Sequence, residues 1–152
     1  MLYVTRTMKF SASHRLFNPE FSEEKNEDIF DKCNNYHGHG HNYQLEVTVA
    51  GRPDPETGYV IDLKKLKGII RENVIDKVDH KHLNFDVDFL FGVIPTVENL
   101  SVIFWNILKD KISGGKLYKI KLYESDTSFV EYYGEAVDIK YFEQLREKNL
   151  NV

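Results

Sequence analysis

The stretch that decides the fold runs from Cys33 to Ala50 and reads CNNYHGHGHNYQLEVTVA. It holds the only cysteine of the chain and three of its six histidines. From Tyr43 onward apolar and polar residues alternate, which predicts a half-buried strand. Counting backwards by two, His41 and His39 extend the apolar face of that strand. The stretch therefore predicts a strand whose buried face ends in two imidazoles.

Residues 2–13 alternate in the same way, with Arg6 as the one break in the apolar face, and His14 continues that face at its end. If the two strands pair, three imidazoles meet, and three histidines with one open position are typical of catalytic zinc. The alternative is a set of hydrogen-bonded core histidines, which this pattern on matching faces disfavours. His37 also lies two residues before His39, but it follows the loop more than the strand and ranks below His41.

The rest of the chain predicts an α+β fold, a four-stranded antiparallel sheet with two helices on one face. Asp62 can cap a helix that ends near Val78, and Thr96 can cap a second one. A shorter helix is expected after Ser22 in the long loop before Cys33. Two further strands are expected at about 117–125 and 128–133. Two open sheet edges remain, which pairing with other subunits would close.

Length and composition narrow the class of protein. The chain has 152 residues, enough for one domain spanning 1–152, and 41% of them are hydrophobic. Its net charge of −4 with mixed signs argues against a general nucleic-acid binder. A single cysteine, no signal peptide and no apolar run of membrane length predict a cytoplasmic protein without a membrane partner. Residues 136–152 are expected to form a C-terminal extension, read as a docking helix.

Three further features carry candidate chemistry. Cys33 lies close to the expected metal, where a thiolate with a lowered pKa could act as base or nucleophile; the alternative is a buried, inert cysteine. Asp79-His80 has the form of a carboxylate that orients a proton-shuttling imidazole, although a surface turn would look the same. Glu124 ends an otherwise apolar strand face and could accept from a ring with adjacent N–H donors, or could simply reach solvent.

Taken together, these residues resemble the 6-pyruvoyl-tetrahydropterin synthases and their bacterial relatives, the 6-carboxytetrahydropterin synthases. Each matching piece is short, but the pieces occur in the family's order over about residues 4–134. They are FSASHRL from Phe10, CNN from Cys33 followed by HGHNY from His39, DHK from Asp79, PTVEN from Pro95, and LYE from Leu122.

The resemblance implies the tunnelling fold (T-fold), in which subunits form trimeric barrels that stack as hexamers with active sites at subunit interfaces. It implies Zn²⁺ as the cofactor and 7,8-dihydroneopterin triphosphate as the substrate of a carbon–oxygen lyase. The residues fall into three implied roles: zinc ligands His14, His39 and His41; a catalytic Cys33 with Asp79 and His80 as its proton relay; and pterin contacts at Glu124, Thr96 and Glu98.

The sequence leaves open whether the chain resembles the pyruvoyl or the carboxy branch of the family, which form different products. Cysteine six residues before the first zinc histidine resembles the pyruvoyl synthases of tetrahydrobiopterin biosynthesis. The carboxy synthases of queuosine biosynthesis often have four, and His37 also offers that spacing. A binding module that keeps the pocket without chemistry is an alternative that the presence of Cys33, Asp79 and His80 disfavours. A dihydroneopterin epimerase or aldolase is a third reading, disfavoured by the zinc-type histidines.

Overall fold

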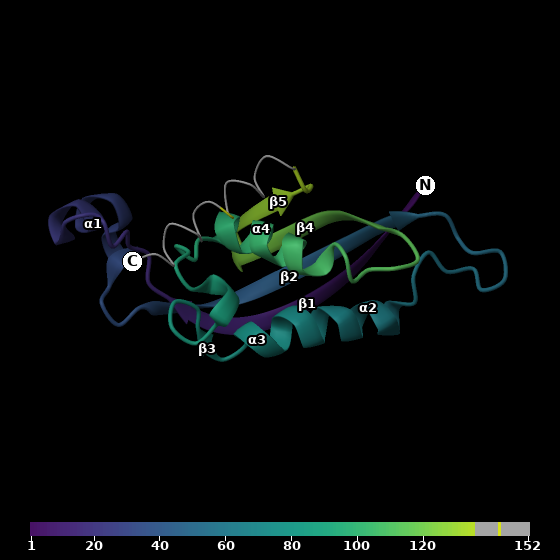
Figure 1. The fold of residues 1–152 in the computed structure, drawn as a ribbon, viewed down its shortest axis with the longest axis horizontal. Helices are drawn as coiled ribbons and strands as arrows, with labels where there is room; N and C mark the ends of the chain where they lie inside the picture. The colour runs from purple at the N-terminus through teal and green to yellow at the C-terminus, as the bar shows by residue number, and fades with distance from the viewer. Residues whose placement is uncertain (136–142, 144–152) are drawn as a thin grey trace.

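We describe a computed structural model of the chain, covering residues 1–135 and 143. Figure 1 shows a twisted sheet with two long strands through its middle and helices packed against it. The expectation of a docking helix at residues 136–152 falls outside the described residues, apart from Glu143. In the described part of the chain, no helix is both long enough and apolar enough to cross a membrane.

The two long strands expected from the sequence form the centre of the sheet. Strand β1 (Leu2–His14) pairs antiparallel with β2 (His39–Gly51) over its whole length. The register places Leu2 opposite Gly51 at one end and His14 opposite His39 at the other. Because side chains alternate between the faces of a strand, this register brings the predicted imidazoles to one side of one end of the sheet.

The sheet has five strands and is mixed, so the prediction of four antiparallel strands was wrong in one respect. Strands β4 (Lys116–Ser125) and β5 (Ser128–Tyr132) follow β2 antiparallel, as expected. A two-residue strand, β3 (Lys81–His82), was expected to be loop and instead pairs parallel with β1 at the opposite edge. A pairing this short leaves no periodicity in the sequence, and only the tertiary structure defines it.

The helices confirm the predicted starts. Ser22 caps α1 (Glu23–Phe30), Asp62 caps α2 (Leu63–Ile70), and Thr96 caps α4 (Val97–Leu108), each side chain accepting a backbone N–H of the first turn. Helix α2 continues through a π-helical turn, Arg71–Ile75, into the short α3 (Asp76–Val78). Two 3₁₀ turns, Asp31–Asn34 and Asp88–Leu90, lie in the connections.

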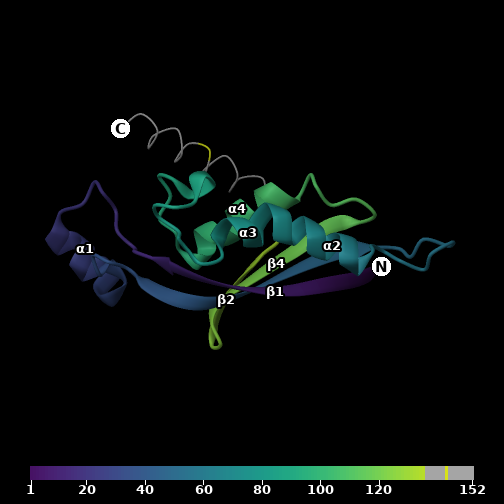
Figure 2. The same cartoon turned by 90° about the horizontal axis from the view of Figure 1, so that it is seen from below.

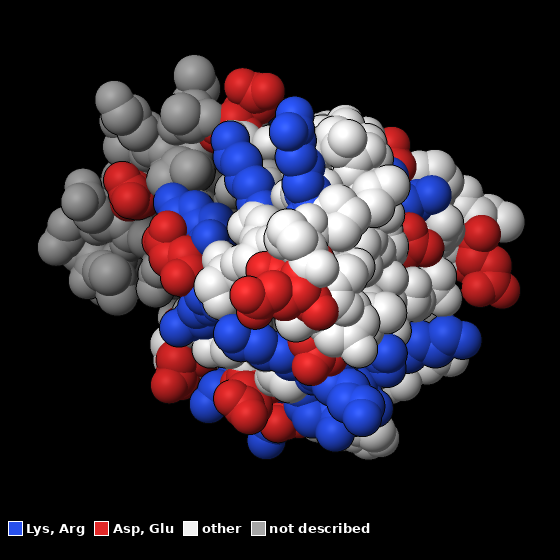
Figure 3. Space-filling model, turned by 90° about the vertical axis from the view of Figure 1, so that its right-hand side faces the viewer, with Lys and Arg blue, Asp and Glu red and all other residues white. Residues whose placement is uncertain are grey.

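Helices α2, α3 and α4 lie on one face of the sheet, and α1 lies beyond the end of β1 and β2 (Figure 2). The core fills the space between that face and the helices, with fully buried side chains such as Leu45, Leu66, Phe104 and Ile120. The end of the molecule shown in Figure 3 carries both basic and acidic side chains, interspersed with uncharged ones. The helix-covered face is the one that receives His14, His39 and His41.

Candidate active site

The three predicted metal ligands meet at the end of the β1–β2 pair. His14 lies opposite His39, and His41 lies opposite Ala12 one step further along. One ring nitrogen from each of the three histidines lies within 4.8 Å of the others. The spacing works because His39 and His41 are two residues apart on one strand, so both side chains leave the same face. The structure therefore assembles the triad from two strands, as the alternation predicted.

Hydrogen bonding fixes the protonation of His14. Its Nδ1 lies 2.8 Å from the backbone oxygen of Pro95, which only accepts, so Nδ1 carries the proton and donates. The Nε2 of neutral His14 then carries a lone pair and no proton. This nitrogen lies 3.1 Å from Nε2 of His39. A backbone carbonyl on the second nitrogen is the usual arrangement behind a metal-binding histidine. Pro95 thus presets His14 for coordination.

The electrostatics also favour the neutral forms of His14 and His41. Burial, above all, lowers the pKa of His14 to about 4, and burial likewise lowers the pKa of His41. Nδ1 of His39 and Nε2 of His41 are buried and have no hydrogen-bond partner. Buried nitrogens without partners are costly unless something else binds there. Converging imidazoles, with one unpartnered nitrogen on His39 and one on His41, fit a divalent metal ion that prefers nitrogen ligands.

His37 is not part of this cluster. Its side chain is exposed, and its ring packs edge-on against Tyr36 in the loop. The first histidine of the triad on β2 is therefore His39, six residues after Cys33. The structure supports the ranking of His37 below His41.

Cys33 lies beside the triad on the 3₁₀ turn that follows α1. Its backbone oxygen accepts a hydrogen bond of 2.8 Å from the N–H of Leu16, which ties the turn to the residues after His14. Burial raises the pKa of the thiol, and the carboxylates of Glu124 and Asp31 raise it further. The prediction of a lowered pKa was therefore wrong for the chain alone, because burial above all, and then the carboxylates of Glu124 and Asp31, disfavour the thiolate.

Asp79 and His80 form the predicted carboxylate–imidazole dyad. Oδ2 of Asp79 lies 3.0 Å from Nδ1 of His80, while its Oδ1 accepts from the backbone N–H of Ser11 at 2.9 Å. The Ser11 hydrogen bond is the largest factor that lowers the pKa of Asp79. His80 adopts a left-handed backbone (φ 59°), and its own N–H donates to the oxygen of Ser11 at 2.7 Å.

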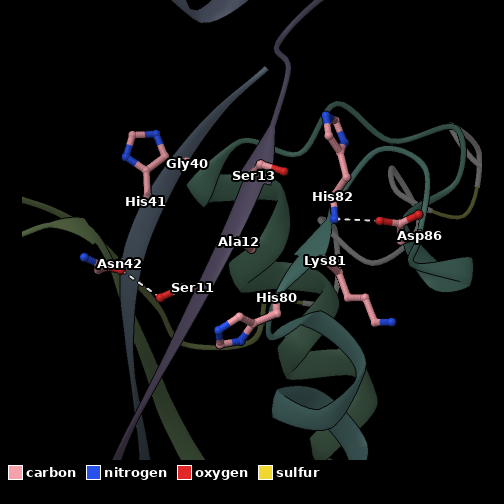
Figure 4. A pocket seen from close by; sticks show the side chains of 10 residues that line it. All are labelled: Ser11, Ala12, Ser13, Gly40, His41, Asn42, His80, Lys81, His82 and Asp86. Carbon is pink, nitrogen blue, oxygen red and sulfur yellow. Dashed lines mark hydrogen bonds between the residues drawn. The ribbon is translucent and has the colours of Figure 1, made fainter. Parts of the chain in front are cut away.

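The dyad is exposed, in contrast to the triad. The His80 side chain is 83% accessible, and His80 lines a shallow depression of about 540 Å³ with Ser11, His41 and Lys81. Figure 4 shows His80 on one side of β1 and His41 on the other, with Ser11 between them. Among the described residues, no contact joins Cys33 to Asp79 or His80. The structure does not bring the thiol and its predicted relay together within one chain.

Of the three predicted substrate contacts, the structure places Glu124 next to the triad. Oε1 of Glu124 is 3.6 Å from Nε2 of His41, and the Glu124 side chain is 26% accessible. Thr96 Oγ1 accepts from the N–H of Asn99 as the cap of α4, directly after Pro95. Glu98 is exposed in the first turn of that helix, where an acidic side chain complements the helix dipole.

Sequence reasoning missed two supports of the triad. The Pro95 carbonyl was not considered, although a proline one residue before a helix cap is a visible signal of a fixed turn. Gly38 was not considered either. It has a φ of 77°, and a Cβ there would lie 2.8 Å from the backbone oxygen of His14. Only glycine fits this approach without strain, so Gly38 lets the loop close directly onto the end of β1.

Comparisons with known proteins agree with the arrangement of this site. Residues 3–135 match the model of a protein family described as 6-pyruvoyl tetrahydropterin synthase. The chain belongs to this family. The 6-pyruvoyl tetrahydrobiopterin synthase of Homo sapiens is 46% identical over 132 residues, which cover 87% of this chain and 91% of the human one.

Two further relatives span the family. The structure of Caenorhabditis elegans 6-pyruvoyl tetrahydropterin synthase superposes with a TM-score of 0.83 at 38% identity, covering 88% of this chain and 96% of that one. The 6-carboxy-5,6,7,8-tetrahydropterin synthase of Aquifex aeolicus is 28% identical, over 87% of this chain and 98% of its own. The fold of this family is therefore that of the present chain, and the identity is higher to the human and nematode pyruvoyl relatives than to this carboxy relative.

Proposed function

We propose that this protein is a zinc-dependent carbon–oxygen lyase that converts 7,8-dihydroneopterin triphosphate into 6-pyruvoyl-tetrahydropterin with loss of triphosphate. The observation that carries the proposal is the preset imidazole triad, with Cys33 and Glu124 beside it. Family membership and 46% identity to the human 6-pyruvoyl tetrahydrobiopterin synthase support the same reaction.

His14, His39 and His41 would hold the ion, and they fit it because one ring nitrogen of each converges within 4.8 Å and burial lowers the pKa of His14 and of His41. Zinc bound there would lower the pKa of hydroxyl groups on the substrate side chain. Glu124 would accept from the adjacent N–H groups of the pterin ring. Thr96 and Glu98 are proposed as further substrate contacts from the first turn of α4.

Cys33 would remove a proton from carbon, and for this the thiol must first lose its own proton. Within the chain the neighbouring carboxylates oppose that loss. We therefore assign the relay to Asp79 and His80 of a neighbouring subunit, whose exposed imidazole is free to approach. The ring accepts the electrons of the redox tautomerisation, so elimination of triphosphate requires no external oxidant or reductant.

This arrangement requires a homo-oligomer, a trimer or a hexamer, with active sites at the interfaces. Its support is the mismatch between a thiol that needs a base and a dyad that faces outward from the same chain. The exposed β3 and β5 edges of the sheet are the surfaces that would pair in a barrel. The single domain 1–152, with residues 136–152 as an extension, and action in the cytoplasm belong to the same proposal.

The second candidate is the 6-carboxytetrahydropterin synthase reaction on the same substrate. The six-residue spacing from Cys33 to His39 favours the pyruvoyl product over it. Incubation of the zinc-loaded protein with 7,8-dihydroneopterin triphosphate, followed by analysis of the products, tests both. We expect triphosphate and a 6-pyruvoyl product; release of acetaldehyde would assign the carboxy reaction. Absence of any turnover would contradict the enzyme and leave a pterin-binding module.

A further inference from the structure

One side chain fastens the turn that carries the thiol to the strand that carries His14. The guanidinium of Arg15 donates twice to Asn34, the residue after Cys33. Its Nε lies 3.0 Å from the backbone oxygen of Asn34, and one Nη lies 3.1 Å from the side-chain oxygen. A planar fork that meets two acceptors of one residue fixes direction as well as distance. The N–H of Leu16 adds a third bond, to the oxygen of Cys33.

Arg15 is itself held rigidly. Its backbone N–H donates to the side-chain oxygen of Asn84 at 2.9 Å, and its backbone oxygen accepts from the amide nitrogen of Asn84, also at 2.9 Å. The guanidinium lies over the ring of Phe17 at 4.3 Å and near the ring of Tyr36 at 5.3 Å. Such stacking restricts the freedom of the long side chain. The fork is therefore set before any ligand arrives.

The contacts connect Cys33 to the triad by a short covalent and hydrogen-bonded route. Arg15 directly follows His14, and Asn34 directly follows Cys33. Asn34 is buried, so its side-chain oxygen needs the partner that Arg15 supplies. Apart from the fork, the bond from the N–H of Leu16 to the oxygen of Cys33 is the hydrogen bond that, among the described residues, ties this turn to the chain after His14. Without the fork, the thiol could shift relative to the imidazoles by pivoting about that bond.

We propose that Arg15 is a positioning residue that fixes the Cys33 thiol at its working distance from the histidine triad by gripping Asn34. The proposal rests on the proposed function, since it gives Cys33 a task that depends on distance. A misplacement of about 1 Å can cost on the order of 100-fold in rate. Arg15 itself needs no contact with the substrate.

The test uses the zinc-loaded full chain with Arg15→Lys, which keeps the charge but loses the fork. We expect kcat to fall at least about tenfold with KM within about twofold, because binding groups stay in place. Alkylation of Cys33 by iodoacetamide, measured without substrate, should become several-fold faster because the turn opens. An unchanged kcat together with an unchanged alkylation rate would overturn the proposal.

A double-mutant cycle tests whether Arg15 acts on Cys33 through Asn34. Asn34→Ala removes one of the two acceptors, and Arg15→Lys combined with Asn34→Ala should be no worse than the worse single variant. Losses that multiply would mean that Arg15 acts elsewhere, and would contradict the proposal.

Asn26→Ala is the matched control for loss of stability. Asn26 is buried in α1 and holds the same long loop through Asn18, with bonds of 2.8 and 3.0 Å, but does not touch Asn34. We expect it to lower the Tm without accelerating alkylation. Acceleration as large as that of Arg15→Lys at an equal loss of Tm would overturn a specific role for Arg15. If the wild-type chain shows no turnover, the proposed function fails. The alkylation rates would still show whether Arg15 holds the Cys33 turn in place through Asn34.

Discussion

The imidazole triad and the Asp79–His80 dyad both adjoin strand β1, but they are held in opposite ways. His14 of the triad is fully buried, its tautomer is fixed by Pro95, and all three imidazoles come from one chain. The dyad hangs on the backbone of Ser11 and presents an imidazole that is 83% accessible. The comparison indicates that one chain brings together all three histidines that could bind a metal, whereas the dyad presents its imidazole to the solvent.

The largest effect is expected at the thiol, which lies next to the complete half of the site. Cys33→Ala should lower turnover by at least about 1,000-fold, since both the base and its proton path are lost. Zinc content and pterin binding should stay near wild type because the triad and Glu124 are untouched. Steady-state kinetics, metal analysis and pterin titration measure these quantities. Substantial turnover without the thiol would exclude Cys33 as the base.

The variant His80→Ala tests the exposed dyad. We expect kcat to fall about 100-fold while the metal content stays unchanged. Mixing this variant with Cys33→Ala chains and reassembling them should restore activity, at about a quarter of the wild-type level if each site combines two subunits at random. Lys81→Ala, a change at the neighbouring exposed residue, is the control. No recovery in reassembled mixtures would show that both groups must lie in the same chain.

The buried His14 of the triad predicts that the stability of the metal-free protein depends on pH. The pKa of His14 is about 4 when folded and 6.5 ordinarily, so between these values the unfolded chain binds a proton that the folded chain rejects. The free energy of unfolding should thus fall by about 3 kcal/mol as the pH drops from 6.5 to 4. Urea titrations across this range measure it. In the His14→Asn variant, the free energy of unfolding should depend less on pH over this range. An unchanged pH dependence in that variant would mean that other groups cause it.

The smallest effect separates two roles of Thr96. Thr96→Val removes the cap of α4 and should lower the free energy of unfolding by about 1 kcal/mol. Thr96→Ser keeps the hydroxyl and should be close to wild type. If Thr96 only caps the helix, KM for the pterin substrate stays unchanged in both variants. A raised KM for Thr96→Val at unchanged zinc content would instead support a direct substrate contact.

The sequence predicted the triad and most elements because each had a local periodic signal. His39 and His41 continue the alternation of β2, and His14 continues that of β1, so their common face followed from counting by two. The helix caps were readable because Ser22, Asp62 and Thr96 each precede a helical pattern. The family resemblance rested on the segments that hold the three histidines, together with those around Cys33, Asp79, Thr96 and Glu124.

The misses arose where tertiary contacts decide the outcome. Tyr118 alternates with Ile120 and Leu122 in the sequence, but an irregularity in the β2–β4 register opposite Thr48 turns Leu117 inward and leaves Tyr118 exposed. The pKa of Cys33 depends on Glu124, which is distant in sequence and adjacent in space. None of these features has a signal in a single stretch of residues.

The register of β1 and β2 has a consequence for folding. Their ends are joined by residues 15–38, a connection too long to dictate how the strands align. A slip by one residue would turn His39 and His41 to the opposite face from His14, and the three nitrogens would no longer converge. A metal ion bound by the triad would stabilise only the native alignment, because slipped pairings do not form the site. Such an ion would therefore favour the correct pairing of the two strands before any substrate is present.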